Sequence, residues 1–72
     1  MIIKLQRPLA SNETDPPWLA YNRTRKVHQL LPRAKLDQVT LLAMGDDAKA
    51  YFEATLVGDR LVFGRRVLDR QW

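Results

Sequence analysis

The chain has 72 residues, of which 46% are apolar and 28% are charged, and its formal net charge is +4. A chain of this length buries only about 60% of the surface that its unfolded form exposes, so its core is thin. The lack of cysteine excludes disulfides, and a single histidine, His28, argues against a zinc site made by the protein alone. We expect one small domain over residues 1–72.

The N-terminal segment lacks the features of a targeting or membrane-spanning sequence. No apolar run approaches the roughly 18 residues that a membrane-spanning helix needs. Lys4 and Arg7 lie where a signal peptide would have its apolar stretch. The sequence therefore predicts a cytoplasmic protein that does not contact a membrane.

The first predicted element is a strand over residues 2–6, in which apolar and polar residues alternate before Pro8. A loop follows over residues 10–17, where Ser, Asn, Asp and two prolines are concentrated. Because this loop is long for a hairpin connection, the first strand need not pair with the second.

A hairpin is predicted next, within residues 18–31. Asn22 tolerates the positive φ of a tight turn, and a turn centred between Arg23 and Thr24 pairs Tyr21 with Lys26. A helix is the alternative, although this segment contains several weak helix formers. In the hairpin, one face carries Trp18, Ala20, Val27 and Leu31, and the other carries Leu19, Tyr21, Lys26 and His28.

After Pro32 the pattern changes to helical spacing. Leu36, Val39, Thr40 and Ala43 recur at the interval of a helix over residues 34–44, and Gly45 suits the position that ends it. The rival interpretation is a strand over residues 38–44, because this apolar run is short and contains β-branched residues.

The clearest pattern is a second hairpin over residues 51–66. Gly58 and Asp59 separate two alternating runs and fit a two-residue turn with glycine first. This register pairs Phe52 with Arg65, and it places Glu53 diagonal to Arg66 for a surface ion pair. The predicted core face of this hairpin carries Phe52, Ala54, Leu56, Leu61 and Phe63.

Together these elements predict an α+β fold with two layers. An antiparallel sheet of four or five strands, in the order β-ββ-α-ββ, is covered by one helix. The residues expected to share one core are Phe52, Leu56, Leu61, Phe63, Leu36, Val39 and Ala43.

Residues suited to catalysis are scarce. Ser11 is the single serine, and it is far in sequence from His28. Asp46 and Asp47 follow a glycine that ends a helix, a pattern typical of a solvated turn rather than a metal site. The three glycines form no phosphate-binding loop. We expect a protein that is not an enzyme and that has no cofactor, metal or small-molecule substrate.

Positive charge is concentrated between residues 23 and 35, where no acidic residue occurs. Cations on a β-surface beside an exposed tyrosine are typical of platforms that bind single-stranded nucleic acid. The alternative is that cations near a hairpin tip protect an edge strand from aggregation. The predicted binding residues for RNA or single-stranded DNA are Tyr21, Arg23, Arg25, Lys26, Arg33 and Lys35.

A second functional hypothesis is a protein-interaction module or a homodimer. A short chain with a thin core gains stability when it buries surface against a partner. The contact would use an exposed sheet edge or Trp72, a large aromatic residue that packs either on the sheet or into a partner.

Overall fold

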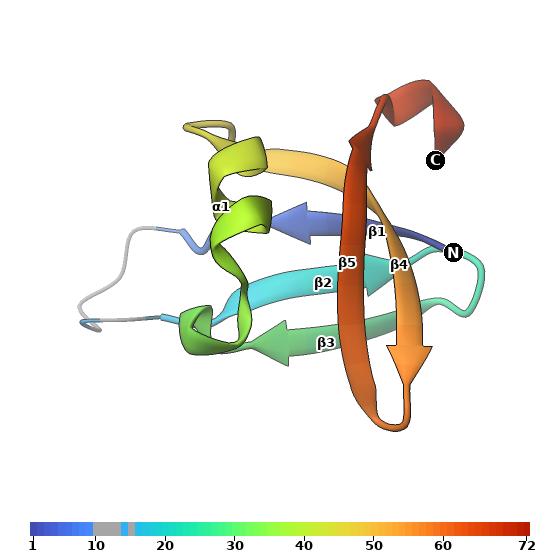
Figure 1. The fold of residues 1–72 in the computed structure, drawn as a ribbon, viewed down its shortest axis with the longest axis horizontal. Helices are drawn as coiled ribbons and strands as arrows, with labels where there is room; N and C mark the ends of the chain where they lie inside the picture. Colours follow the sequence, from blue (N-terminus) through green and yellow to red (C-terminus); the bar gives the residue numbers. More distant parts are fainter. Residues whose placement is uncertain (10–13, 15) are drawn as a thin grey trace.

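The computed structural model describes residues 1–9, 14 and 16–72. It has one antiparallel sheet, one α-helix and two short 3₁₀ turns, which confirms the predicted α+β fold (Figure 1). The strands follow the order β3-β2-β1-β4-β5 across the sheet. The elements along the chain are β1 (Ile2–Gln6), β2 (Trp18–Asn22), β3 (Val27–Leu31), η1 (Arg33–Lys35), α1 (Gln38–Met44), β4 (Lys49–Val57), β5 (Arg60–Val67) and η2 (Asp69–Gln71).

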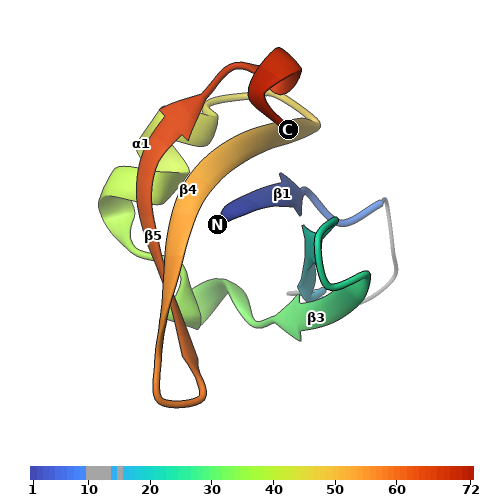
Figure 2. The ribbon, with the colours of Figure 1, turned by 90° about the vertical axis from the view of Figure 1, so that its right-hand side faces the viewer.

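The sheet bends strongly along β4. The first part of this strand pairs with β1 over residues 49–53, and the rest continues with β5 to the turn at Gly58. As a result, the hairpin of β4 and β5 crosses the other three strands at a steep angle (Figures 1 and 2). We call the face toward α1 the inner face and the opposite face, with Lys4, Tyr21 and Tyr51, the outer face.

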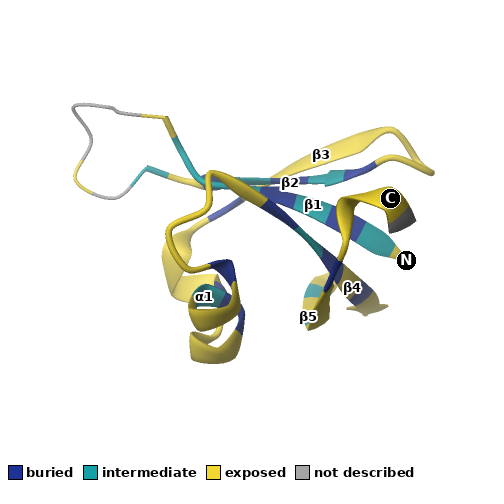
Figure 3. Ribbon diagram, turned by 90° about the horizontal axis from the view of Figure 1, so that it is seen from above, coloured by how far each residue is buried: buried dark blue, intermediate teal, exposed yellow. Residues whose placement is uncertain are grey.

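The core lies between the inner face of the sheet and α1 (Figure 3). Leu5, Phe52 and Met44 have no exposed surface. Leu61 and Phe63 are partly buried against this cluster, and the Phe63 ring meets the Phe52 ring edge-on at 5.8 Å. The buried hydrophobic cluster consists of Ile3, Leu5, Trp18, Ala20, Leu31, Leu36, Met44, Ala50, Phe52 and Ala54.

The predicted helix over residues 34–44 is correct only in its second part. Residues 33–35 form the 3₁₀ turn η1, Leu36 is extended, and α1 begins after Asp37. The Asp37 carboxylate accepts a hydrogen bond of 2.6 Å from the Thr40 backbone N–H, which caps the helix. Hydrogen bonding with Thr40 lowers the pKa of Asp37, because it stabilises the charged carboxylate.

This later start also changes which face of the helix is buried. Thr40 and Met44 are buried in the core. Val39 and Leu42, in contrast, are 74% and 71% exposed. Ala43 is exposed as well. The prediction that Val39 and Ala43 are core residues is therefore wrong, because the spacing from Leu36 was counted through residues that are not helical.

The expectation that the first strand need not pair with the second is also corrected. The central strand β1 pairs antiparallel with β2 on one side and β4 on the other. The predicted loop over residues 10–17 lies partly outside the described residues. Its length does not prevent this pairing, since closing a longer loop costs little additional entropy.

The first hairpin forms, but its turn lies one residue later than predicted. Tyr21 pairs with His28, not with Lys26, and the turn spans residues 23–26. The Asn22 side-chain oxygen accepts hydrogen bonds from the backbone N–H groups of Thr24 and Arg25, and Lys26 has a φ of 54°. Moving the turn by one residue shifts the pairing of the two strands by two residues, because Tyr21 now lies opposite His28. A shift of two residues keeps every strand residue on the same face, so the predicted assignment of strand residues to the two faces still holds.

The second hairpin has the predicted turn, and Gly58 has the positive φ that this turn needs. Further from the turn, two residues of β5, Gly64 and Arg65, lie opposite Glu53 alone. This β-bulge pairs Phe52 with Arg66 instead of Arg65. The predicted core residue Leu56, near the turn, is 39% exposed and lies outside the core cluster.

The bulge exchanges the partners of the two neighbouring arginines. Arg65 pairs with Glu53 at 3.3 Å, in place of the predicted pair between Glu53 and Arg66. Arg66 lies beside α1, where it donates hydrogen bonds to the Ala43 carbonyl and to the Asp47 carboxylate. The bulge thereby ties β5 to the C-terminal end of the helix.

Candidate functional site

One transverse row of the outer face collects most of the aromatic residues that are not in the core. The strand register pairs Lys4 with Tyr21 on one side and with Tyr51 on the other, and it pairs Tyr21 with His28. These four residues therefore lie side by side on β3, β2, β1 and β4. Alternation along each strand points all of them away from α1.

The C-terminal residue Trp72 joins this row. After β5, the turn η2 brings the chain back over the outer face, and the chain ends near the start of β1 (Figure 2). The Trp72 ring lies 5.5 Å from the Tyr21 ring and 5.0 Å from the Tyr51 ring, measured between centroids. The Lys4 ammonium lies 5.6 Å from the Tyr21 centroid and 5.7 Å from the Trp72 centroid. Of the two placements left open for Trp72, the structure shows packing on the sheet.

The row of rings ends in His28 at the edge strand β3. His28 stacks on Tyr21 with centroids 4.4 Å apart and an interplanar angle of 25°. Tyr21 therefore has His28 on one side and Trp72 on the other. His28 is exposed on the edge strand β3, so the side of its ring away from Tyr21 can accept a further planar group. We call Tyr51, Trp72, Tyr21 and His28, with Lys4 among them, the aromatic row.

The turn between β2 and β3, which we call the basic turn, borders one end of the aromatic row. It consists of residues 23–26, all exposed, and it carries Arg23, Arg25 and Lys26. The two hydrogen bonds to Asn22 fix its backbone. Arg23 donates a hydrogen bond of 3.0 Å to the backbone oxygen of Trp72, so the basic turn touches the aromatic row.

The surrounding charge is mainly positive. The strands β1 and β4 carry two lysines, Lys4 and Lys49, and one acidic residue, Glu53, on the outer face. Glu53 forms an ion pair with Arg65. Within the described part of the chain, neither Arg25 nor Lys26 takes part in an ion pair. These two side chains therefore offer cationic groups to an external anion.

The six residues predicted from sequence fall into two groups in the structure. Tyr21 and the three cations of the basic turn lie at one end of β3, whereas Arg33 and Lys35 lie in η1 at the other end. The seven steps of the chain from Lys26 to Arg33 span roughly 23 Å when extended. The two groups cannot contact the same phosphate.

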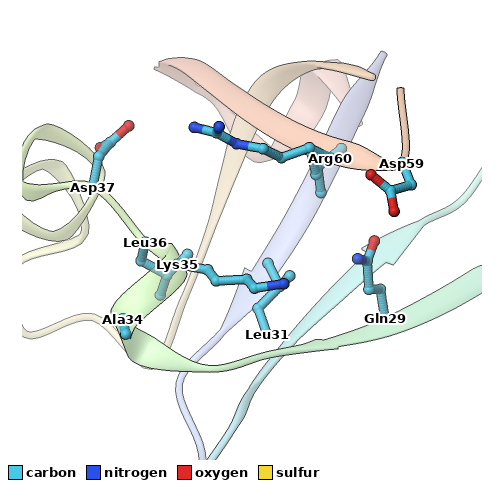
Figure 4. A pocket seen from close by; sticks show the side chains of 9 residues that line it. Gln29, Leu31, Ala34, Lys35, Leu36, Asp37, Asp59 and Arg60 are labelled. Carbon is cyan, nitrogen blue, oxygen red and sulfur yellow. The ribbon is translucent and has the colours of Figure 1, made fainter. Parts of the chain in front are cut away.

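Lys35 instead lines a cavity of about 500 Å³ between β3, η1 and the start of β5 (Figure 4). Arg60, Asp37 and Asp59 line the same cavity, together with Gln29. Two cations and two carboxylates give this cavity no net charge. It lies on the inner side of β3 and does not share the electrostatic character of the basic turn.

Sequence reasoning missed four members of the aromatic row. The sequence pattern places His28 on the same face as Tyr21 but not beside it, and it does not connect Lys4, Tyr51 and Trp72 with Tyr21. The signal for His28 was Asn22, whose side chain can cap a four-residue turn and thereby set the register that pairs His28 with Tyr21. For Trp72 the sequence holds no comparable signal, because its position depends on the path of η2.

Comparison with protein-family models, with curated proteins and with solved structures finds no match for this chain. Among residues 1–9, 14 and 16–72, no cluster of three or more metal-ligating side chains occurs. No helix in the same residues is long and apolar enough to cross a membrane.

Proposed function

We propose that this protein binds single-stranded nucleic acid, RNA or DNA, on the outer face of its sheet. The observation that carries this proposal is the aromatic row beside the basic turn, joined by the contact between Arg23 and Trp72. Proteins that bind single strands combine aromatic side chains for base stacking with a cationic surface for the backbone. Both components lie next to each other here.

The basic turn supplies the contacts to phosphate. If Arg23, Arg25 and Lys26 each neutralise one phosphate, counterion release gives a slope of about −2 for the logarithm of affinity against the logarithm of salt concentration. Affinity then falls about 20-fold between roughly 50 mM and 200 mM salt. This steep dependence distinguishes phosphate binding from apolar association.

The aromatic row supplies the contact to a base. Tyr21, the base-stacking residue predicted from sequence, has ring neighbours on both sides, so we assign the base contact to His28, which is exposed on the edge strand β3. A base stacked on His28 extends the row beyond β3, next to the exposed side chain of Leu30. Such base stacking contributes roughly 1–3 kcal/mol per base.

A titration with a labelled single-stranded oligonucleotide, as RNA and as DNA, tests the proposal. Arg25→Glu with Lys26→Glu reduces the net charge from +4 to 0, since each substitution removes two units, and we expect an affinity loss of at least about tenfold at low salt. Arg33→Glu with Lys35→Glu makes the same change of charge at the other end of β3, and it serves as the matched control. Equal losses in both variants indicate attraction by net charge alone and contradict the assignment of the site.

The alternative role of the basic turn is to protect the edge strand β3 from pairing with other chains. Under that alternative, the wild type binds no oligonucleotide at low salt. Arg25→Glu with Lys26→Glu then leaves the protein monomeric, because the new charges also oppose pairing. Absence of binding to both RNA and DNA at low salt therefore refutes the proposed function.

A second candidate function is self-association, which is favoured by the exposed apolar residues Val39 and Leu42 on α1. These two residues lie on adjacent turns of the helix and form one patch that a second copy could cover. Light scattering during gel filtration measures the molar mass directly. A dimer that dissociates in Val39→Asp, and whose stability depends little on salt, supports this function over nucleic-acid binding.

A further inference from the structure

The two tyrosines of the aromatic row are separated by a space that fits one planar ring. Tyr21 and Tyr51 lie on β2 and β4, with β1 between them. Two strand spacings place their backbones roughly 9.6 Å apart. A ring halfway between them lies about 4.8 Å from each, and the Trp72 centroid is observed at 5.5 Å and 5.0 Å.

The occupant of this space resembles a purine base in shape. The indole of Trp72 is a planar, fused five- and six-membered ring, as is a purine. The Lys4 ammonium lies near both the Tyr21 and the Trp72 rings. The indole is tilted by 36° to the Tyr21 ring and lies edge-on to the Tyr51 ring, at 68°. A nucleotide that replaces Trp72 would meet one tilted ring, one edge-on ring and a cation, which are groups that bind a base and its phosphate.

The segment that carries Trp72 is weakly attached. Within the described part of the chain, the polar and ring contacts that join Trp72 to the strands and to the basic turn are the two ring contacts, the approach of Lys4 and the hydrogen bond from Arg23 to the Trp72 backbone oxygen. The turn η2 has only three residues and does not pair with any strand. Segments with so few backbone contacts open at low cost in free energy.

Arg23 connects the two halves of the site. Its guanidinium contacts the Trp72 backbone oxygen, and the same guanidinium belongs to the basic turn that we assign to phosphate. A phosphate at Arg23 competes with the hydrogen bond that holds Trp72. Binding of a strand to the turn therefore weakens the closed position of the tryptophan.

We propose that the space between Tyr21 and Tyr51 is a nucleobase-binding site, that Trp72 closes it in the free protein, and that a nucleotide strand opens it by competing for Arg23. This inference rests on the proposed function. When the binding-competent state is only partly populated, the apparent affinity falls by that fraction, so removing Trp72 increases affinity.

The experiment compares the wild type with Trp72→Ala and with the control Leu68→Ala, a change of an exposed residue in the same C-terminal segment. The probes are a labelled single-stranded oligonucleotide and adenosine monophosphate, both at low salt. We expect Trp72→Ala to bind the oligonucleotide at least about fivefold more tightly and Leu68→Ala to match the wild type. Adenosine monophosphate should shift the ring NMR signals of Tyr21 and Tyr51 in Trp72→Ala more than in the wild type.

A second measurement uses the unmodified protein. The indole N–H of Trp72 gives one NMR signal, and that of the buried Trp18 gives a reference. Addition of oligonucleotide should abolish the ring contacts between Trp72 and the two tyrosines while the Trp18 signal stays unchanged.

The outcomes separate this inference from the proposed function. If the wild type binds the oligonucleotide through the basic turn but Trp72→Ala binds equally or more weakly, Trp72 is part of the binding surface and the closure is refuted. Retention of the Trp72 contacts in the complex refutes it as well. If neither protein binds the oligonucleotide, the proposed function fails and the nucleobase site fails with it.

Discussion

The β-bulge in β5 predicts that two neighbouring arginines contribute very differently to stability. Arg66 donates 2.8 Å and 2.6 Å hydrogen bonds to the Ala43 carbonyl and the Asp47 carboxylate, at the C-terminal end of α1. A cation in this position contributes about 0.3–1 kcal/mol through the helix dipole, and the exposed ion pair adds about 0.2–1 kcal/mol. We expect Arg66→Ala to destabilise the protein by about 1.5 kcal/mol.

Arg65 is the matched comparison, because it has the same side chain one position earlier. Its partner is Glu53 at 3.3 Å, and the Arg65 and Glu53 side chains are 74% and 51% exposed. Such a pair contributes little, and we expect Arg65→Ala to cost less than about 0.5 kcal/mol.

Urea denaturation followed by far-ultraviolet circular dichroism measures both differences. For a domain of this size, the expected loss in Arg66→Ala corresponds to a decrease in Tm of roughly 6–12 °C. Asp47→Ala should lose only part of this stability, since Arg66 keeps its bond to Ala43. If Arg65→Ala costs as much as Arg66→Ala, the register of the bulge and the argument from it are refuted.

Two further predictions concern α1. Met44→Ala should reduce the free energy of unfolding by about 2–5 kcal/mol, because Met44 is fully buried. Val39→Ala, on the exposed side of α1, should reduce it by less than about 0.5 kcal/mol in the same urea assay. The reverse order would support the helix orientation predicted from sequence. Asp37→Ala should cost about 1 kcal/mol at neutral pH through loss of the cap. Because the pKa of Asp37 is lowered in the folded state, this contribution is present above the unfolded pKa near 4 and is lost as pH falls through the folded pKa. The difference in unfolding free energy between the wild type and Asp37→Ala should therefore shrink from about pH 5 downward, and a constant difference would contradict the role of the charged cap.

Local patterns in the sequence were sufficient for the positions of the strands and for the turn of the second hairpin. Gly58 and Asp59 fix a two-residue turn, and alternation on both sides then sets the pairing of Leu56 with Leu61. The bulge could not be predicted in this way, because one extra residue at Gly64 leaves the alternation of β4 unchanged. The partners of Arg65 and Arg66 depend on that single residue.

The start of α1 was missed for a related reason. Spacing from Leu36 suggested a continuous helix, whereas the capping side chain of Asp37 places the first helical residue at Gln38. Tertiary packing then buries Leu36 from an extended position. The spacing of apolar residues alone does not distinguish these two arrangements.

The candidate site was predictable in the charges of its turn and in Tyr21, but not in its other rings. The run of cations identified the basic turn directly. The aromatic row depends on three strand pairings and on the return of the chain through η2, and these connect residues as far apart in sequence as Lys4 and Trp72. Arg33 and Lys35 were grouped with the basic turn because they are near it in sequence, while β3 separates them in space.

The most direct test of the account is an NMR titration of the isotopically labelled wild-type protein with a short single-stranded RNA at low salt. We expect saturable changes in the signals of His28, Tyr21, Trp72 and residues 23–26, with the signals of Arg60 and Lys35 around the inner cavity unchanged. Changes confined to Arg60 and Lys35, or no changes at any of these residues, would contradict it.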